Sequence, residues 1–371
     1  MSNNFNEVKH NSNEESVKTS FLKFPIGVFF IISSIASLWI NEYFNILSIK
    51  KINLIKEYAI EISSSKIDRN NDDRLISTNG SVYSNETLKD TLISVNNALV
   101  LQRTVEMYQW NEIKHSRKKN RSTKYSYKKI WSNTELNSDK FKNRGYRNPK
   151  FYINDKTISV NKASMGDFKL NQEQLNKMTS FFPITLSQPQ KNYIIHNNYY
   201  YKGRNPMAPE IGDIRISYKY VPNGTSLSII GQQKSNNTIS KLIIENVDIY
   251  TQYDGSLSLD EIITKFKNEE NIARNMIRFL CCFTIFVGLN ILTIPIKKIA
   301  SYVPFIGNIV EKLSVFIMLL ISIVLTLISI VSAWLFYRPL FAGVLIALII
   351  LVKIWYKKSI QQKNNSSVQI Q

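Results

Sequence analysis

The chain contains 371 residues, of which 44% are hydrophobic, and its 47 Lys and Arg residues exceed its 28 Asp and Glu residues by 19. The apolar residues gather in a few runs instead of spreading along the chain, which excludes a single soluble globule. The two cysteines, Cys281 and Cys282, both fall in one apolar run, which excludes a disulfide framework or a thiolate metal site from the polar middle of the chain.

Four apolar runs without charged residues occupy positions 24–40, 279–296, 313–337 and 339–352. A helix needs about 20 residues to cross a hydrocarbon core of about 30 Å, and each run reaches or approaches this length. The predicted fold class is therefore an α+β integral membrane protein. It has four transmembrane helices and a large β-rich lumenal domain between the first and the second.

The residues before the first apolar run, 1–23, contain too few apolar side chains to fold, which predicts a disordered tail. A cleaved signal peptide is the competing interpretation, because Ser34-Ile35-Ala36 matches a small-residue cleavage site. The long tail with three acids and the continuation of the run to Ile40 favour an uncleaved anchor.

Helical periodicity continues beyond the first run, from Phe44 to Ile62, and predicts an amphipathic helix that leads into the domain. At the other end of the domain, Ser258 and Glu261 have the spacing of a capping box, which satisfies backbone donors at a helix start. A second amphipathic helix is therefore expected ahead of the second span.

Between these helices the pattern favours strands. Residues 99–113 and 124–133 are β-rich runs joined by a basic connection, which predicts a long hairpin. A tight turn is predicted at Pro222-Asn223-Gly224, and a short helix from Asn171 to Met178 with Asn171 as N-cap. Further strands are expected at 192–201, 213–221, 225–232 and 239–250.

The distribution of Lys and Arg predicts the orientation in the membrane. With the amino-terminal tail in the cytosol, the tight turn between the third and fourth spans contains only Arg338, although Arg274 and Arg278 beside the second span argue weakly the other way. The cytosolic side receives ten lysines: Lys9, Lys18, Lys23, Lys297, Lys298, Lys312, Lys353, Lys357, Lys358 and Lys363.

The predicted organisation is a cytosolic tail, a first span, a lumenal domain with flanking amphipathic helices, a second span, a cytosolic loop, a third and a fourth span, and a cytosolic tail. These segments occupy residues 1–23, 24–40, 41–275, 276–296, 297–312, 313–337, 339–356 and 357–371, respectively. Pro339 disfavours helix in the residue before it, so the third and fourth spans are expected to form a tight hairpin.

Residues 114–129 contain eight bases and no acid. A solvated hairpin tip is the favoured interpretation, and a patch that faces lipid or a partner is the second. A nucleic-acid surface would need this segment to be cytosolic, whereas the predicted topology places it across the membrane.

No catalytic, cofactor-binding or metal site is expected. The three histidines, His10, His115 and His196, are not spaced as metal ligands. His196 is expected to pack within a strand. The carboxylates of the domain are scattered without a pairing, among them Glu106, Glu112, Glu210 and Asp213. We therefore predict that the protein is not an enzyme and has no cofactor.

Several residue types have a structural and a functional interpretation. The Tyr199-Tyr200-Tyr201 run is expected to form sheet surface, and Cys281-Cys282 to be apolar filler in preference to a lipidation site. Hydroxyl groups in the spans are expected to bond back to the helix or to a neighbour. In a lumenal domain, glycosylation acceptors would be the sequons at Asn79, Asn85, Asn120, Asn223 and Asn236.

A set of motifs in order resembles the LUMA family, also called transmembrane protein 43, from about Lys23 to Tyr356. The motifs are Arg103-Thr104-Val105-Glu106-Met107-Tyr108-Gln109-Trp110, Tyr125-Ser126-Tyr127, Trp131, Asn148-Pro149, Gly212-Asp213-Ile214-Arg215 and Trp334-Leu335-Phe336-Tyr337-Arg338-Pro339. The resemblance implies a four-span protein of the endoplasmic reticulum membrane and nuclear inner membrane, or of the cell envelope membrane if the source is bacterial. It implies no catalytic residues.

The expected function is that of a non-enzymatic multi-pass membrane scaffold, which self-associates and organises protein complexes and membrane structure at the nuclear envelope. Its expected partners are the lipid bilayer and further copies of the chain as a homo-oligomer, with no nucleic acid. The resemblance implies emerin-like or lamin-like nuclear-envelope proteins as further partners. The alternative is an anionic-lipid-binding sensor or lipid-handling protein, in which the basic loop and the helix from Phe44 to Ile62 contact head groups.

Overall fold

The computed structural model describes residues 22–116, 123–295 and 306–339, together with 343–344, 347–348 and 350–354. Several predicted features lie wholly or largely outside these residues. They are the two tails, the hairpin tip with the sequon at Asn120, residues 297–305 of the predicted cytosolic loop, and much of the fourth span. The chain divides into a helical unit, up to Asn53 and from Thr264 onward, and a β unit from Leu54 to Ile263.

Three long helices account for most of the helical unit in the described part of the chain. They are α2 (Phe24–Tyr58), α4 (Leu259–Leu292) and α6 (Ile306–Tyr337). Each contains a segment that is long and apolar enough to cross a membrane. Both α2 and α4 continue without a break beyond these segments into the β unit, where Leu54, Ile55, Ile262 and Ile263 are buried.

One helix boundary differs from the prediction, and the helix that contains the predicted third span begins before that span. The helix α2 ends at Tyr58, and Ile62 lies in the strand β1 (Ile60–Ser63), because Ile60 and Ile62 follow strand alternation and pair in parallel with β2. The helix α6 begins at Ile306, inside the predicted cytosolic loop at 297–312. Apolar residues at Ile306, Ile309, Val310 and Leu313 extend the helical period of the span to that point.

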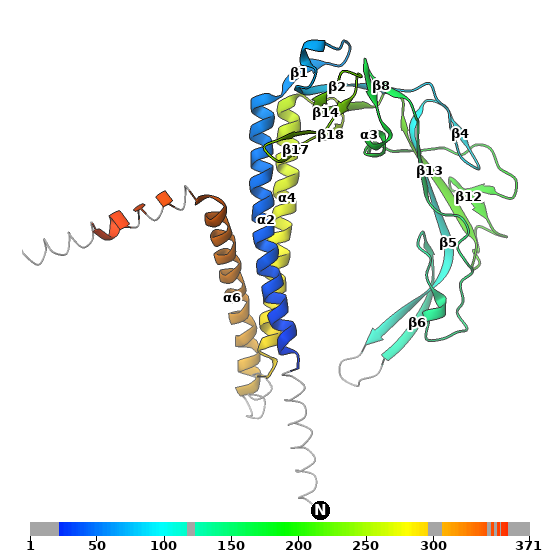
Figure 1. The fold of residues 1–371 in the computed structure, drawn as a ribbon. Coiled ribbons are helices and arrows are strands. Elements are labelled where there is room, and N and C mark those ends of the chain that lie inside the picture. The colour runs from blue at the N-terminus through cyan, green and yellow to red at the C-terminus, as the bar shows by residue number, and fades with distance from the viewer. Residues whose placement is uncertain are drawn as a thin grey trace, which may run out of the picture. The chain divides into compact units, whose positions relative to one another are not determined.

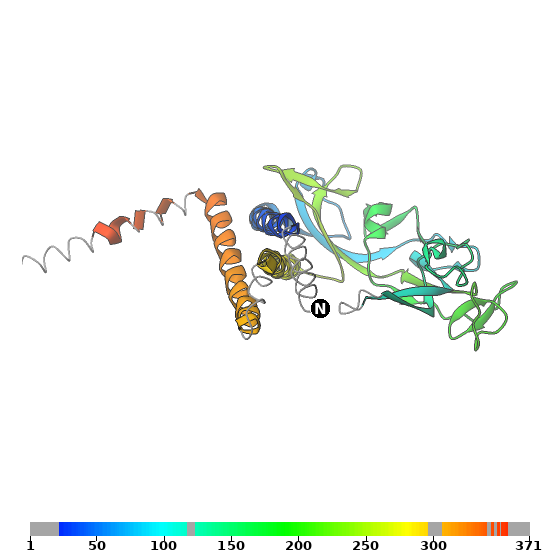
Figure 2. The same ribbon diagram turned by 90° about the horizontal axis from the view of Figure 1, so that it is seen from below.

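Helices α2 and α4 approach closely at a pair of glycines. A Cβ atom added to Gly288 would lie 2.9 Å from the carbonyl oxygen of Gly27 and 3.0 Å from Cγ1 of Ile31. Small residues allow this approach, which is the usual source of packing between helices in lipid. Figures 1 and 2 both show the two helices side by side.

Further along the same helices, Leu38, Cys281 and Ile285 form a buried cluster against which Leu325 and Ile330 of α6 pack. One face of α6 carries small and hydroxyl side chains that are buried within the helical unit: Ser322, Thr326, Ser329 and Ala333. The three hydroxyl groups donate to carbonyl oxygens one turn earlier in α6, as the sequence predicted for hydroxyls in the spans.

A charged pair joins α2 and α4 at the end of their apolar segments. Arg278 Nε and Nη2 donate to Glu42 Oε1 at 2.8 and 2.6 Å, and the Glu42 side chain is only 1% exposed. Asn45 Nδ2 donates to the other oxygen of Glu42 at 3.1 Å. The positive charge of Arg278 is therefore compensated within the helical unit.

An aromatic cluster lies near the same end of the helical unit. Trp39 packs on Phe336 with ring centroids 5.3 Å apart, and Tyr43 packs on Tyr337 at 5.6 Å. Because tryptophan and tyrosine favour the membrane–water interface, this cluster and the Glu42–Arg278 pair indicate where the apolar segments end. The α6 helix ends at Tyr337, just before Arg338-Pro339.

The β unit contains two larger sheets in the described residues, and each has seven strands. The first sheet has the order β15-β14-β2-β8-β9, with β1 paired to β2 and β18 to β14. Its strands are β1 (Ile60–Ser63), β2 (Leu75–Tyr83), β8 (Ala163–Met165), β9 (Phe168–Leu170), β14 (Ser226–Gln233), β15 (Ile239–Ser240) and β18 (Thr251–Asp254).

The second sheet has the order β11-β12-β13-β5-β6, with β10 paired to β13 and β7 to β5. Its strands are β5 (Ala98–Ser116), β6 (Thr123–Ser132), β7 (Lys156–Ser159), β10 (Phe182–Pro183), β11 (Ile194–His196), β12 (Tyr199–Lys202) and β13 (Ile214–Pro222). Two small pairs complete the β structure of the described chain: β3 (Leu88–Lys89) with β4 (Ser94–Val95), and β16 (Leu242–Ile244) with β17 (Val247–Ile249).

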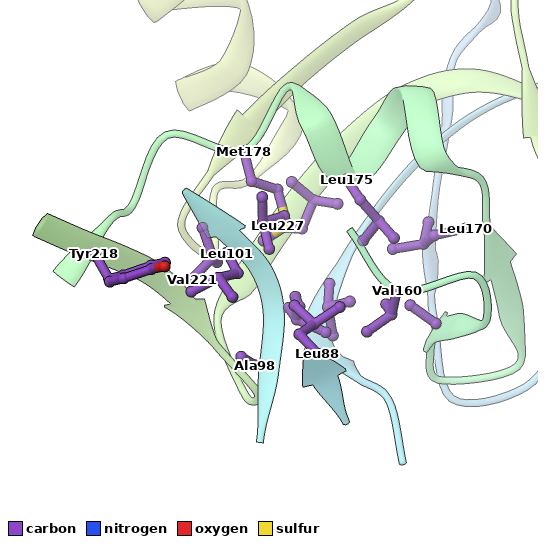
Figure 3. Close-up of a cluster of buried hydrophobic side chains, with 14 of the residues drawn as sticks. Leu88, Ala98, Leu101, Val160, Leu170, Leu175, Met178, Tyr218, Val221 and Leu227 are labelled. Atoms are coloured by element: carbon purple, nitrogen blue, oxygen red, sulfur yellow. The ribbon is translucent and has the colours of Figure 1, made fainter. Parts of the chain in front are cut away.

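Apolar side chains from both sheets form the hydrophobic core of the β unit. Leu101 of β5, Leu227 of β14 and Leu175 of the short helix α3 (Gln172–Asn176) belong to one buried cluster (Figure 3). Phe168 and Tyr218 are among its largest fully buried side chains. This cluster provides the main apolar burial of the unit, which stabilises it in proportion to the area removed from water.

Most local predictions for the β unit are confirmed. The hairpin predicted from 99–113 and 124–133 is β5 paired with β6 in antiparallel register. Asn171 caps α3 with a capping box to Gln174, and Ser258 caps α4 with Glu261. The predicted turn lies between β13 and β14, where Gly224 has a φ of +81° and the chain passes from the second sheet to the first.

Two predicted strands are each broken in the middle. Residues 192–201 divide into β11 and β12 at Asn197-Asn198, and residues 239–250 divide into β15, β16 and β17, with Glu245-Asn246 between the last two. Both dipeptides have positive φ at both positions, which is the conformation of a two-residue hairpin turn. Asparagine tolerates positive φ and so indicated these turns, but the neighbouring isoleucine and tyrosine residues favour strands and obscured the indication.

Candidate functional site

The outer end of the β5–β6 hairpin and the segment that follows it form a distinct part of the β unit. We call residues 133–150 the strap, and the strap together with 111–116 and 123–132 the basic lobe. The strap includes the 3-10 turn η2 (Ser138–Lys140) and lies against one face of the hairpin. The hairpin itself is long because β5 has 19 residues and pairs with β13 along its first half and with β6 along its second.

Aromatic rings connect the strap to the hairpin. Tyr146 of the strap stacks on Tyr127 with ring centroids 3.9 Å apart and meets Trp110 edge-on at 4.7 Å. Further along the same face, Tyr108 packs on Trp131, its direct cross-strand partner, at 5.1 Å. Such pairs add about 0.5–1.5 kcal/mol each beyond the area that they bury.

Hydrogen bonds hold the strap in register with the hairpin. Asn148 Oδ1 accepts from the backbone N–H of Trp110 at 2.7 Å, and Asn148 Nδ2 donates to the carbonyl of the same residue at 2.9 Å. The buried Gln109 donates to the carbonyl of Thr134 and accepts from the N–H of Leu136. The asparagine thus replaces the missing neighbouring strand at the edge formed by Trp110.

Glu112 has a structural role in the same assembly. Its Oε2 accepts from Tyr127 Oη and from the backbone N–H of Lys142, both at 2.6 Å. Burial and the hydrogen bond to Glu112 raise the pKa of Tyr127, because both favour the neutral phenol. Glu112 therefore acts as a fixed acceptor for the strap and is not placed as a free acid or base.

A second polar cluster lies where β13 and β6 pair with β5, and where β12 pairs with β13. The guanidinium of Arg215 lies 4.5 Å from the ring centroid of Trp131 and 4.8 Å from that of Tyr199, and its Nε donates to Glu106 at 2.7 Å. Arg215 and Glu106 are direct cross-strand partners, so the sheet register itself brings this pair together.

Asp213 is enclosed beside this cluster. It accepts a hydrogen bond from Tyr201 Oη and another from the backbone N–H of Glu210 at 2.7 Å. Burial and the carboxylate of Asp213 raise the pKa of Tyr201. In the core, burial and a hydrogen bond to Asp90 similarly raise the pKa of Tyr218, while Arg103 binds both oxygens of Asp90.

The four acidic residues named from the sequence therefore do not form one shared site, because each makes its own local contacts. Glu106, Glu112 and Asp213 each have a structural partner, and Glu210 contributes a backbone donor. His196 lies in β11 opposite Tyr199, and His115 contacts Ser126 within the hairpin. Within the residues that the structure describes, no group of three or more His, Cys, Asp and Glu residues is placed to hold a metal ion.

Two hollows on the surface of the β unit have volumes of about 690 and 710 Å³. Asp90 lines the first, but its carboxylate is bound by Arg103 and Tyr218. Glu86 lines the second and accepts from the backbone N–H groups of Asn161 and Lys162. Both acids therefore hold the polypeptide in place, and their oxygens are not left for chemistry on a substrate.

Charge distinguishes the basic lobe from the rest of the β unit. Residues 111–150 contain 13 Lys and Arg against 3 Asp and Glu, whereas residues 41–110 and 151–275 together contain 22 against 21. Nine of these bases lie in the described part of the lobe and all are exposed: Lys114, Lys124, Lys128, Lys129, Lys140, Lys142, Arg144, Arg147 and Lys150. Sequence reasoning located the hairpin bases but missed those of the strap, although five occur between 140 and 150.

A β unit entered and left by continuous helices, with three helices that are each apolar enough to cross a membrane, defines an integral membrane protein with a large β-rich domain between its first two spans. The Transmembrane protein 43 family model matches residues 107–339, which include the basic lobe, β13 and the end of α6. The chain belongs to this family, which confirms the resemblance found in the sequence motifs.

Curated relatives match over most of their length. Transmembrane protein 43 of Rattus norvegicus is 25% identical over 323 residues, which cover 80% of this chain and 81% of the relative. The Homo sapiens protein is 26% identical over 307 residues, with 76% of each chain covered. The Transmembrane protein 43 homolog of Drosophila melanogaster is 23% identical and covers 82% of this chain and 85% of its own. No solved structure matches this chain.

Proposed function

We propose that the chain is a non-enzymatic multi-pass membrane scaffold, which self-associates and organises protein complexes and membrane structure. It has four spans, the fourth after Pro339, and both tails lie on the cytosolic side. The β unit lies in the lumen of the endoplasmic reticulum and in the perinuclear space, or outside the inner membrane of a bacterial cell. The names of its relatives describe a membrane protein and no catalytic activity, in agreement with this role.

The observation that carries this proposal is the continuity of α2 and α4, which have 35 and 34 residues without a break. About 20 residues of each suffice to cross the bilayer. The remainder forms a paired stalk, in which Ser48 donates to Glu270 at 2.7 Å and Lys51 lies 4.8 Å from the Phe266 ring centroid. A domain attached in this way at both ends is suited to hold partners at the membrane.

The internal packing of α6 restricts where self-association can occur. Its hydroxyl-bearing face is buried against the rest of the helical unit and is not exposed to a second copy. We therefore place the homo-oligomer contact on the β unit. Emerin-like or lamin-like nuclear-envelope proteins remain the proposed partners, with the lipid bilayer as the permanent one.

Cross-linking of the full chain in mild detergent, combined with native mass spectrometry, tests self-association. We expect discrete oligomers whose cross-links map to residues 54–263. A chain that is monomeric at all concentrations, or cross-links confined to α6, would contradict the scaffold proposal.

The structure makes a glycosylation test of orientation specific. Asn85 and Asn236 are exposed, whereas Asn223 donates to and accepts from the backbone of Ser84, and Asn79 bonds to Leu257 and Ser256. In a eukaryotic host that glycosylates its lumenal proteins, Asn85→Gln and Asn236→Gln should each remove one glycosidase-sensitive step in mobility. Asn79→Gln and Asn223→Gln are the matched controls and should not. An unglycosylated domain that is digested in sealed vesicles would reverse the orientation.

A second function, recognition of anionic lipid, is favoured by the concentration of base in the basic lobe. The helix from Phe44, which the sequence also suggested for this role, uses Ser48 and Lys51 for contacts with α4. The lobe is therefore the stronger candidate for contact with head groups.

A further inference from the structure

The exposed bases of the strap are free of internal compensation. Lys140, Lys142, Arg144, Arg147 and Lys150 make no ion pair with any residue that the structure describes. Some surface bases elsewhere in the β unit do have such partners, since Lys177, Lys234 and Lys241 pair with Glu173, Asp73 and Asp248. Uncompensated charges at this density repel one another, and an anionic surface relieves that repulsion.

The backbone that carries these bases is held rigidly. Asn148, Gln109 and Glu112 fix the strap at three points, and Tyr146 packs between Tyr127 and Trp110. The side chains of Lys142, Arg144 and Arg147 project from this fixed segment and are exposed. A ligand therefore meets a pre-organised set of cations and does not need to order the backbone.

The same packing distinguishes between classes of anionic ligand. Proteins that bind single-stranded nucleic acid offer free aromatic faces for stacking with bases. Here one face of Tyr127 is covered by Tyr146. Trp110 contacts both Tyr146 and the ammonium group of Lys129, which lies 5.1 Å from the Trp110 ring centroid. The lobe thus presents mainly point charges, which suit phosphate and carboxylate head groups at a membrane surface.

The covalent attachment of the β unit to the apolar helices also favours a membrane surface as the ligand. The β unit is joined to the apolar helices at Leu54 and at Ile263, so a bilayer is always within reach of the chain. Tethering raises the effective concentration of head groups around the lobe, so that weak individual contacts suffice.

We infer that the strap of the basic lobe is a docking surface for membranes rich in anionic phospholipid, with Lys142, Arg144 and Arg147 as its main contacts. This inference rests on the second proposed function and names the surface and the chemistry that perform it. The contact is electrostatic, is not specific for one head group, and weakens as salt screens it.

The test uses the full chain in nanodiscs of neutral phosphatidylcholine, mixed with sucrose-loaded vesicles of phosphatidylcholine with or without phosphatidylserine. We expect co-sedimentation with the anionic vesicles at low salt and its loss at high salt. Each base near such a surface contributes about fivefold in affinity. The triple variant Lys142→Gln, Arg144→Gln, Arg147→Gln should therefore weaken binding by about a hundredfold.

A matched variant controls for net charge. Lys66, Lys156 and Lys191 are exposed residues of the β unit outside the lobe, and their replacement by Gln removes the same number of charges. This control should bind as the unmodified chain does, and Arg144→Lys with Arg147→Lys, which keeps the charge, should also retain binding. Equal losses in the strap variant and the control would overturn the inference.

Two further results would overturn it. One is equal binding to vesicles with and without phosphatidylserine. The other is tighter capture of a single-stranded or double-stranded oligonucleotide than of the anionic vesicles at the same salt, which would assign the surface to nucleic acid. Cross-linking of the strap variant separates this inference from the scaffold proposal, since oligomers should persist when vesicle binding is lost.

Discussion

The internal packing of the helical unit differs from that of the β unit. In the β unit, apolar side chains from two sheets and α3 enclose a common core. In the helical unit, the contacts between helices depend on Gly27 and Gly288, a short row of small side chains on α6 and the Glu42–Arg278 ion pair. The difference follows from the surroundings, because lipid is as apolar as leucine and gives helices no hydrophobic reason to associate. Shape and polar contacts therefore decide packing there, whereas burial decides it in the β unit.

Truncation of a core side chain in the β unit should have the largest effect. Phe168 is fully buried in β9, and Phe168→Ala should lower the free energy of unfolding by about 3–5 kcal/mol through lost burial and a cavity. Denaturant unfolding of the full chain, followed by tryptophan fluorescence, measures this. Phe182→Ala, at a ring that is 54% exposed, is the control and should cost much less. Equal losses of unfolding free energy in the two variants would contradict the assignment of Phe168 to the hydrophobic core.

Addition of a side chain at the glycine contact tests the helical unit. In Gly288→Leu the new side chain meets the backbone of α2, so the helices must separate, with a loss of about 3 kcal/mol. Disulfide cross-linking between cysteines introduced in α2 and α4 should report the separation. Gly343→Leu is the control, because a Cβ there has no neighbour within 4 Å. Unchanged cross-linking in Gly288→Leu would contradict the close approach.

Alkaline pH should destabilise the β unit through Tyr201 and Tyr218. Burial and a neighbouring carboxylate raise the pKa of both phenols, while burial raises the pKa of Tyr250 to about 12. Unfolded tyrosine ionises near pH 10, so the stabilisation is complete below that pH and is lost as pH rises further. Each fully shifted group costs about 1.4 kcal/mol per pH unit, which gives about 2–3 kcal/mol at about pH 11 for Tyr201 and Tyr218.

Absorbance of tyrosinate during an alkaline titration provides the measurement. The exposed tyrosines should ionise first, and these three only as the far-ultraviolet circular dichroism of the β unit is lost. Ionisation of every tyrosine before any structural change would show that these phenols are not enclosed.

The ion pair at the end of the spans should have an intermediate effect. Glu42→Ala leaves Arg278 without its partner, and we expect a loss of about 2 kcal/mol, below the ~3–5 of a fully buried pair because Arg278 is 30% exposed. The double variant Glu42→Leu, Arg278→Leu should regain part of this stability, because it removes both charges. Thermal melting in detergent compares the three proteins. A double variant that is less stable than Glu42→Ala would show that the pair itself is the main stabilising contact.

The smallest effect is expected at the start of α4. Ser258→Ala removes the acceptor for the N–H of Glu261 and should cost about 1 kcal/mol. Thr264→Ala, on the exposed side of the same helix, also removes a hydroxyl and should be nearly neutral. Because hydrogen bonds from Ser258 lower the pKa of Glu261, the contribution of the cap should be present at neutral pH and be lost as pH falls through the carboxyl range.

The sequence predicts the long elements of both units because their signals are strong and local. Apolar length identifies the span-forming parts of the helices, and the Ser258–Glu261 and Asn171–Gln174 pairs mark helix starts. The hairpin of β5 and β6 follows from β-branched and aromatic content. The turn at Glu245-Asn246 was missed, because a left-handed pair without glycine is a weak signal beside Ile243 and Ile244.

The site was predictable only in part. The basic run in the hairpin is visible in the sequence, and so are the motif residues Tyr108, Trp110, Tyr127, Trp131 and Asn148. Their convergence on one strap depends on Asn148 reaching the edge of β5, a contact across 38 residues that no local pattern encodes. The Glu42–Arg278 pair, across 236 residues, was missed for the same reason.

The unbroken course of α2 has a consequence for how the chain tolerates insertions. Leu38 is buried in the helical unit, and further along α2 the ammonium group of Lys51 lies 4.8 Å from the Phe266 ring centroid of α4. Because both residues belong to one helix, the helix fixes the angle between these two contacts. One residue inserted near Ile49 would rotate one end against the other by about 100°, so that one of the two contacts must break. Seven residues inserted at matching positions in both α2 and α4 would change the angle in each helix by only about 20° and lengthen the stalk by about 10 Å. The helix pair therefore tolerates a joint change in length far better than a change in phase.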